Sequence, residues 1–186
     1  MRLALLLPLF LIGCCSQPTQ GTADQASFAA AARAIDGDTL SVDFRLLGLD
    51  APEKRQLCAN DQGWWPCGKA AQDYLARALR DQEVRITLAS GRTYRRRVAT
   101  VEVSGVDLGE RLIAAGLAVP AVQYLKSDPD RATRYQRAFA TAKKAEAGMH
   151  AGRWIEPAKW RRGERLSCEA RVSRRGKGPD TRTGPA

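Results

Sequence analysis

Apolar and polar residues alternate along several short stretches of the chain. This pattern predicts β-strands, because successive side chains of a strand point to opposite faces. In the clearest stretch, Val84, Ile86 and Leu88 would face the core, and the polar residues between them would face solvent. Turn-forming pairs, Asp36-Gly37 and Ser90-Gly91, separate neighbouring stretches. The pattern predicts five strands, over residues 27–35, 39–42, 44–49, 83–89 and 97–103.

A second pattern repeats apolar residues every three or four positions and predicts three helices, over residues 67–81, 107–115 and 128–148. Asp128-Pro129 has the order of a helix cap followed by a first-turn proline, and Gly116 and Gly148 are typical helix terminators. The predicted core-facing stripes are Ala70, Ala71, Tyr74, Leu75, Ala78 and Leu79 in the first helix and Ala132, Tyr135, Ala138, Phe139 and Ala142 in the third. Five short strands with three helices predict an α+β protein, a small five-stranded Greek-key barrel of the OB type.

The first 13 residues have the layout of an export signal. Arg2 precedes an apolar run over residues 3–12, which is too short to span a bilayer. The sequence Leu11-Ile12-Gly13-Cys14 resembles a bacterial lipobox, in which Cys14 would carry a lipid that anchors the protein to a membrane. An ordinary signal peptide cut nearby is the alternative. We therefore expect an exported protein, either a periplasmic or cell-surface lipoprotein or a secreted one.

The rest of the chain divides by composition. A length of 186 residues suits one domain with targeting and tail segments. Residues 14–26 are small and polar, which is typical of a flexible tether, and residues 27–162 would form the single folded domain. Residues 163–186 are basic and end in an Arg/Gly/Pro-rich stretch, so we expect a disordered tail. We expect the protein to be a monomer.

The chain is strongly basic. It has 30 Lys and Arg against 20 Asp and Glu, a formal net charge of +10. Such an excess creates a positive potential that attracts polyanions, with nucleic acid the first candidate and an anionic membrane surface the second. Charge alone does not decide between these partners and simple solubility.

Export makes the cysteines informative. Cys58 and Cys67 flank a turn-rich loop, and an oxidising compartment favours a disulfide between them. A metal site is the weaker alternative, because no second Cys or His pair accompanies them and the only histidine is His150, which we expect to be structural or exposed. The pairing of Cys15 and Cys168 is not determined by the sequence.

Three carboxylates in the first part of the domain point to a cation. Asp38 follows the first turn, and Asp50 and Glu53 follow the end of the third predicted strand. Acids brought together repel one another unless a cation lies among them, and hard divalent ions prefer carboxylate and carbonyl oxygens. The proline after Ala51 extends the backbone, which can turn the Ala51 carbonyl towards such an ion. Arg45, five residues before Asp50, would bring a guanidinium to the same region. Taken singly, each of these residues also suits an ordinary turn or surface ion pair.

The motifs Asp36-Gly37-Asp38-Thr39, Arg45 to Glu53, and Tyr94-Arg95-Arg96, in this order, resemble the staphylococcal nuclease (thermonuclease) family over about residues 33–154. The roles that the resemblance implies are calcium ligation by Asp38, Asp50 and the main-chain carbonyl of Ala51, catalysis by Arg45, Glu53 and Arg96, and substrate binding by Tyr94. It further implies an endonuclease, a calcium-dependent (Ca2+) hydrolase that cleaves phosphodiester bonds in DNA and also in RNA, with low sequence specificity, and leaves 3′-phosphates.

Two departures from the family pattern concern the site. Only six residues separate Asp38 from Arg45, fewer than the family normally uses, and the short connection can shift Asp38 relative to Asp50. Arg95 stands where the family usually has glycine, so it is the alternative to Arg96 as phosphate ligand. A non-catalytic nucleic-acid-binding OB module tethered at the cell surface is the competing hypothesis, and an envelope protein that meets anionic lipid is the third.

Overall fold

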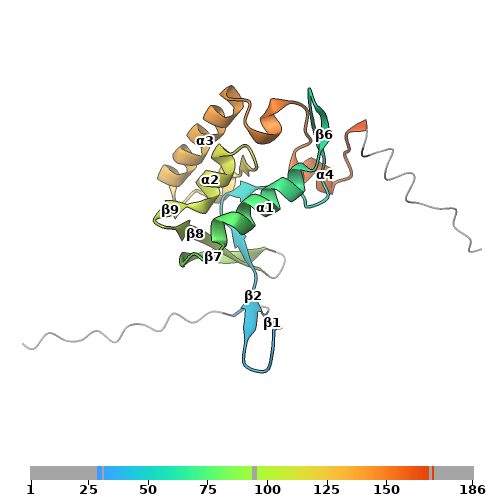
Figure 1. The fold of residues 1–186 in the computed structure, drawn as a ribbon. Coiled ribbons are helices and arrows are strands. Elements are labelled where there is room, and N and C mark those ends of the chain that lie inside the picture. Colours follow the sequence, from blue (N-terminus) through green and yellow to red (C-terminus); the bar gives the residue numbers. More distant parts are fainter. Residues whose placement is uncertain (1–28, 31, 94–95, 168, 170–186) are drawn as a thin grey trace, which may run out of the picture.

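The computed structural model describes residues 29–30, 32–93, 96–167 and 169 (Figure 1). The predicted export signal (1–13), the tether (14–26) and most of the predicted tail lie outside these residues, as do Cys14, Cys15, Tyr94, Arg95 and Cys168. None of the helices in the described residues has the length and the apolar composition that a membrane span requires.

The described chain alternates short strands with helices. The strands are β1 (Ala32–Ala34), β2 (Leu40–Val42), β3 (Phe44–Leu46), β4 (Leu49–Asp50), β5 (Cys58–Asn60), β6 (Gly63–Trp65), β7 (Val84–Thr93), β8 (Arg96–Val103), β9 (Val106–Asp107) and β10 (Val119–Pro120). The helices are α1 (Cys67–Leu79), α2 (Leu108–Ala114), α3 (Pro129–Lys144) and α4 (Pro157–Arg161), with 3-10 turns η1 (Val122–Tyr124) and η2 (Gly148–Ala151).

The largest sheet consists of β3, β8 and β7 in that order, with β9 also paired to β8. β3 runs parallel to β8, whereas β7 and β9 run antiparallel to it. Three antiparallel pairs stand apart from this sheet: β1 with β2, β4 with β10, and β5 with β6. The predicted α+β class is confirmed. The strands of the described residues close no barrel among themselves, so the five-stranded Greek-key barrel stays a prediction.

The single strand predicted over residues 44–49 is wrong, because the chain turns at Gly48 between β3 and β4. Gly48 has a φ of 75°, and a Cβ atom there would lie 2.6 Å from the Leu125 side chain. Only glycine combines this backbone conformation with so close a neighbour. The turn separates β3, which pairs with β8, from β4, which pairs with β10, and the side chains of Arg45 and Asp50 meet across it.

The turn predicted at Ser90-Gly91 is also wrong. β7 continues through it, with an irregular register between Leu88 and Arg92 where β7 pairs with β8. Ile86 is 41% exposed instead of facing the core. The reason is that β7 lies at the edge of the sheet, and the apolar cluster beneath this part of the sheet includes Val84 but not Ile86.

The helices α1, α2 and α3 gather on one side of the β7–β8 ribbon, where they enclose the main core (Figure 1). Asp107 caps α2 by accepting hydrogen bonds from the backbone N–H groups of Gly109 and Glu110, and Asp128 caps α3 as predicted. Tyr135, from the predicted stripe of the third helix, is 1% exposed within this core. These local signals were sufficient to place α2 and the start of α3.

Two helix ends differ from the prediction. α1 ends at Leu79, which is 36% exposed, since the core beside the end of the helix extends only to Ala78. α3 ends at Lys144, so Gly148 does not terminate it. Gly148 instead begins η2 and packs its backbone against Gly116, whose carbonyl accepts a 3.0 Å hydrogen bond from the Met149 N–H.

The predicted disulfide between Cys58 and Cys67 is confirmed, with a Cα–Cα distance of 5.6 Å and both residues fully buried. It ties the start of β5 to the first residue of α1. The packed structure continues beyond the domain boundary predicted at residue 162, because Glu169 is 7% exposed and accepts a 2.8 Å hydrogen bond from the Leu57 N–H. The C-terminal segment therefore lies against the loop that follows β4.

Candidate active site

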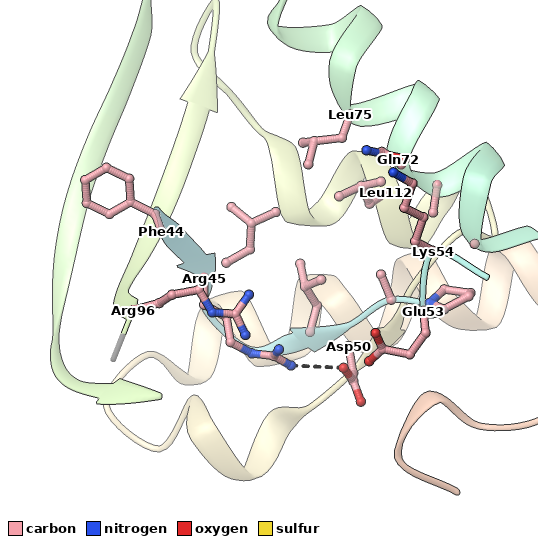
Figure 2. A pocket seen from close by; sticks show the side chains of 15 residues that line it. Phe44, Arg45, Asp50, Glu53, Lys54, Gln72, Leu75, Arg96 and Leu112 are labelled. Carbon is pink, nitrogen blue, oxygen red and sulfur yellow. Dashed lines mark hydrogen bonds and ion pairs between the residues drawn. The ribbon is translucent and has the colours of Figure 1, made fainter. Parts of the chain in front are cut away.

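A pocket of about 350 Å³ opens between β3, β4, the start of β8 and the helix α1 (Figure 2). Its apolar lining includes Leu46, Leu49, Leu75 and Leu112. The charged side chains that line it are Arg45, Asp50, Glu53, Lys54 and Arg96. Apolar walls with a few charged groups at one side are typical of a binding pocket, because the walls exclude water and the charges orient the ligand.

Arg45 and Asp50 meet across the turn at Gly48. Arg45 Nη2 lies 2.9 Å from Asp50 Oδ1, and the two side chains are 29% and 15% exposed (Figure 2). The pairing of β4 with β10 places Asp50 opposite Val119, which fixes the backbone that carries the carboxylate. Arg45 also lines the pocket, and in the described structure only its Nη2 contacts Asp50, so the guanidinium can bind a second anion there.

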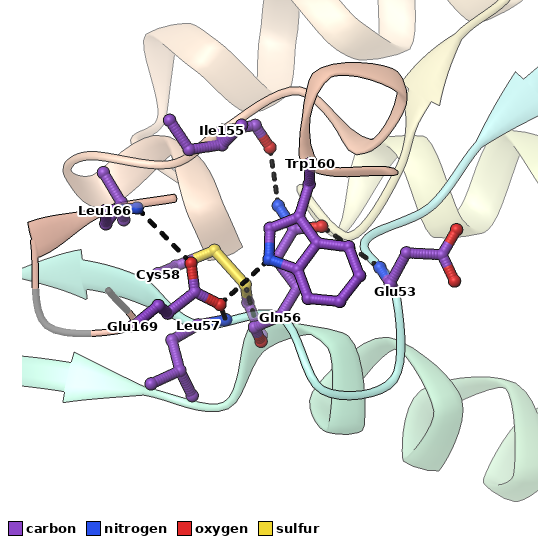
Figure 3. The surroundings of a disulfide bond; sticks show 9 residues. Glu53, Gln56, Leu57, Cys58, Ile155, Trp160, Leu166 and Glu169 are labelled. Carbon is purple, nitrogen blue, oxygen red and sulfur yellow. Dashed lines mark hydrogen bonds between the residues drawn. A yellow bond between two sulfur atoms is a disulfide. The ribbon is translucent and has the colours of Figure 1, made fainter. Parts of the chain in front are cut away.

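Glu53 lies beside Asp50 and is fixed through its backbone. The Glu53 N–H donates a 3.1 Å hydrogen bond to Gln56 Oε1, and the Gln56 N–H donates a 2.7 Å hydrogen bond to the Glu53 carbonyl (Figure 3). Gln56 is fully buried, and its Nε2 donates to the Ile155 carbonyl at 2.6 Å. One buried side chain therefore joins the backbone of Glu53 to the segment that leads into α4.

Arg161, the last residue of α4, contacts both carboxylates. Its Nη2 lies 2.7 Å from Asp50 Oδ2, and its Nη1 lies 3.1 Å from Asp50 Oδ1 and 2.9 Å from Glu53 Oε1. The hydrogen bond with Asp50 raises the pKa of the Arg161 guanidinium, partial burial lowers it by less, and Glu53 adds to the rise. Arg161 therefore remains positively charged beside the pocket.

Sequence reasoning missed Arg161. It stands in a basic stretch in which nothing distinguishes it from Lys159 or Arg162. Only the fold selects it, because the Gln56 side chain holds the chain before α4 next to Glu53.

Arg96 lines the same pocket from the first residue of β8 and lies beside Arg45 (Figure 2). The structure thus brings four of the predicted side chains together: Arg45, Asp50, Glu53 and Arg96. Ala51 also lines this pocket, between the two carboxylates in the chain.

Asp38 is not brought to the pocket. It lies in the turn of the β1–β2 hairpin, which projects away from the rest of the fold (Figure 1). Its carboxylate accepts a 3.1 Å hydrogen bond from the Thr39 hydroxyl, and the base of the hairpin is closed by an ion pair between Arg33 and Asp43. With so few residues between Asp38 and Arg45, the hairpin continues outward instead of folding over the pocket.

The described residues fit a calcium ion only in part. They contain no group of three or more His, Cys, Asp or Glu side chains placed to hold a metal. Asp50 and Glu53 do converge on one positively charged group, but that group is the Arg161 guanidinium. The oxygen donors suit a hard cation, whereas the third carboxylate expected from the sequence lies on the hairpin.

Taken together, the pocket can bind an anion with guanidinium groups and offers a carboxylate at its side. Planar guanidinium groups bind phosphate oxygens through paired hydrogen bonds. A carboxylate beside such an anion can accept a proton from a water molecule, provided that it is within reach.

A family model described as staphylococcal nuclease homologue matches residues 43–152, more than half of the chain. Every residue that lines the pocket lies within the matched range, whereas Asp38 and Arg161 lie outside it. No curated protein matches the chain. The resemblance predicted from the sequence motifs is confirmed by the family match.

Proposed function

Because the chain belongs to the staphylococcal nuclease homologue family, we propose that it is a nuclease, a hydrolase that cleaves phosphodiester bonds in DNA and in RNA. The observation that carries the proposal is the pocket within the matched region, where Arg45 and Arg96 lie beside Asp50 and Glu53. The strongly basic chain supports a polyanionic substrate. Contacts to backbone phosphates carry affinity without sequence information, so we propose low sequence specificity.

Each pocket residue has a part in the proposed reaction. Arg45 and Arg96 bind the scissile phosphate and oppose the negative charge that grows on its oxygens in the transition state. Glu53 accepts the proton of the attacking water. Asp50 orients Arg45 through their 2.9 Å ion pair, which keeps one face of that guanidinium aimed at the substrate.

Calcium dependence and cleavage that leaves 3′-phosphates are parts of the proposal that come from the family. In the family pattern, calcium polarises the phosphate and orients water. Asp50 and Ala51 line the pocket, but Asp38 does not. The steps above are therefore assigned to protein side chains alone.

The direct test is cleavage of plasmid DNA and of single-stranded RNA by the purified full-length chain, with calcium and with chelator. We expect the wild type to cut and the Glu53→Gln variant to lose about 100- to 10,000-fold in rate while binding DNA as before. Glu83→Gln, at an exposed position beside β7, is the matched control and should cut at the wild-type rate. A folded wild type that cuts nothing would refute the proposal, and so would a Glu53→Gln variant that cuts like wild type.

The second candidate function is a non-catalytic module that holds nucleic acid at the cell surface. The position of Asp38 on the projecting hairpin favours it, because the expected set of carboxylates is incomplete at the pocket. This candidate predicts DNA binding that weakens with salt, without cleavage, and no effect of Glu53→Gln on binding.

We also propose that the protein is exported and anchored through a lipid on Cys14, and that it acts as a monomer. The buried Cys58–Cys67 disulfide supports an oxidising compartment. Incorporation of a radioactive fatty acid by the wild type but not by Cys14→Ser tests the anchor. If both chains remain unlabelled but are exported, an ordinary signal peptide is the better explanation.

A further inference from the structure

The positively charged guanidinium of Arg161 contacts the carboxylates of both Asp50 and Glu53. It contacts both oxygens of Asp50 and one oxygen of Glu53 at 2.7 to 3.1 Å. These are the two carboxylates that line the pocket, and Arg161 is the only group in the described structure that contacts both. A positive charge between two carboxylates reduces the repulsion between them.

The segment that carries Arg161 is fixed independently of this contact. Glu169, which is 7% exposed, accepts hydrogen bonds from the Leu57 N–H at 2.8 Å and from Trp160 Nε1 at 3.0 Å (Figure 3). Arg165 stacks on the Trp160 ring with a distance of 3.7 Å to its centre. Because Trp160 directly precedes Arg161, these contacts place the base of α4 beside the pocket whether or not Arg161 pairs with acids.

The Arg161 side chain is nevertheless partly open to solvent. It is 37% exposed, whereas Asp50 is only 15% exposed. The guanidinium can therefore rotate into water without unfolding α4 or moving Asp50. The pair with Asp50 is bidentate, so a cation that replaces Arg161 must compete with two charge-assisted hydrogen bonds at that carboxylate.

We propose that Arg161 is an internal counter-cation of the pocket, supplied by the C-terminal segment from outside the matched family region, and that a divalent cation must displace its guanidinium to reach Asp50 and Glu53. The inference rests on the proposed function, since it concerns the carboxylates of the same site. According to this inference, the segment that carries α4 controls the affinity of the pocket for a divalent cation. It does so through a single side chain, that of Arg161.

The test is calorimetric titration of the chelator-stripped, full-length chain with calcium chloride alone, without nucleic acid. Arg161→Gln removes the competing guanidinium, so we expect it to bind calcium about tenfold more tightly than the wild type. Arg161→Lys keeps a cation that pairs with fewer oxygens, so its affinity should lie between the two. Arg162→Gln is the matched control: it removes the same charge from the next, exposed residue, which pairs with neither carboxylate in the described structure.

The control separates local competition from a general loss of positive charge. If Arg161→Gln binds calcium no more tightly than Arg162→Gln, the inference is wrong. It is also wrong if no variant binds calcium, because no divalent ion then competes for the carboxylates. Thermal unfolding of each variant in chelator shows whether α4 is still in place. The titration uses no substrate, so a failure of the proposed nuclease activity is seen only in the separate cleavage assay.

Discussion

Truncation of Gln56 should destabilise the fold and disable the pocket together. Gln56 is fully buried, and its amide links the Glu53 N–H to the Ile155 carbonyl at 3.1 and 2.6 Å. Gln56→Ala leaves both backbone groups without their partner. Because each hydrogen bond is only partly buried, each loss costs about 1 kcal/mol, and the space left by a buried side chain costs about 1 kcal/mol more. We therefore expect the free energy of unfolding to fall by about 3 kcal/mol.

Urea unfolding at neutral pH, with the disulfide intact, measures this loss. For a denaturant slope of about 2 kcal/mol per molar, the midpoint should fall by about 1.5 M. Gln62→Ala, in the exposed turn between β5 and β6, makes the same substitution without a buried amide and should leave the midpoint nearly unchanged. In conditions where Gln56→Ala is still folded, its nuclease activity should be reduced, because Glu53 and Arg161 lose their common support. A loss below 1 kcal/mol would show that water replaces the amide, and it would refute the reasoning.

Three further predictions concern stability. Replacing Cys58 and Cys67 by alanine should lower the free energy of unfolding by about 2.5 kcal/mol, as estimated for a loop with a sequence separation of 9, and addition of a thiol reductant to the wild type should give the same urea midpoint. Burial lowers the pKa of His150, so the folded state takes up its proton less readily than the unfolded state. The contribution of His150 is therefore complete above about pH 6.5 and is lost as the pH falls through the lowered pKa, and the urea midpoint of His150→Gln should fall less than that of the wild type between pH 7 and pH 5. Tyr135→Phe removes a 2.9 Å hydrogen bond to Asp107 from a side chain that is 1% exposed, which should cost about 1.5 kcal/mol in thermal unfolding; an unchanged melting temperature would contradict it.

The elements that the sequence predicted best are those whose signals are local. Asp107 and Asp128 hydrogen-bond to backbone N–H groups two or three residues later, so the residues that begin α2 and α3 are all visible within one turn of chain. The core-facing stripe of α3 follows from helical spacing alone. Such features depend little on what the rest of the chain does.

The errors arose where a distant contact decides the local conformation. Gly48 ends β3 because Leu125, far along the chain, leaves no room for a side chain there. Ile86 alternates correctly with its neighbours, yet in the described residues the apolar cluster that packs against this edge strand includes Val84 and not Ile86. Hydrophobic periodicity records which residues share a face, but it does not record whether another element covers that face.

The predicted site residues show the same difference between local and distant contacts. Arg45, Asp50 and Glu53 lie within nine consecutive positions on both sides of one turn, so their motif predicts that they meet, and they do. Asp38 depends on the path of a hairpin, which the motif does not specify, and the shortened connection to Arg45 leaves it outside the pocket.

The cation beside the carboxylates depends on still longer-range contacts. Arg161 is 108 positions from Glu53 and reaches it only because Gln56 and Glu169 attach the C-terminal segment to the loop after β4. Two acids placed together by a local motif attract positive charge, and a sequence motif for metal binding does not say whether that charge comes from an ion or from a side chain. In this fold, an arginine already supplies the charge. The strength of metal binding should therefore depend on how firmly Arg161 is held as well as on the number of carboxylates at the pocket.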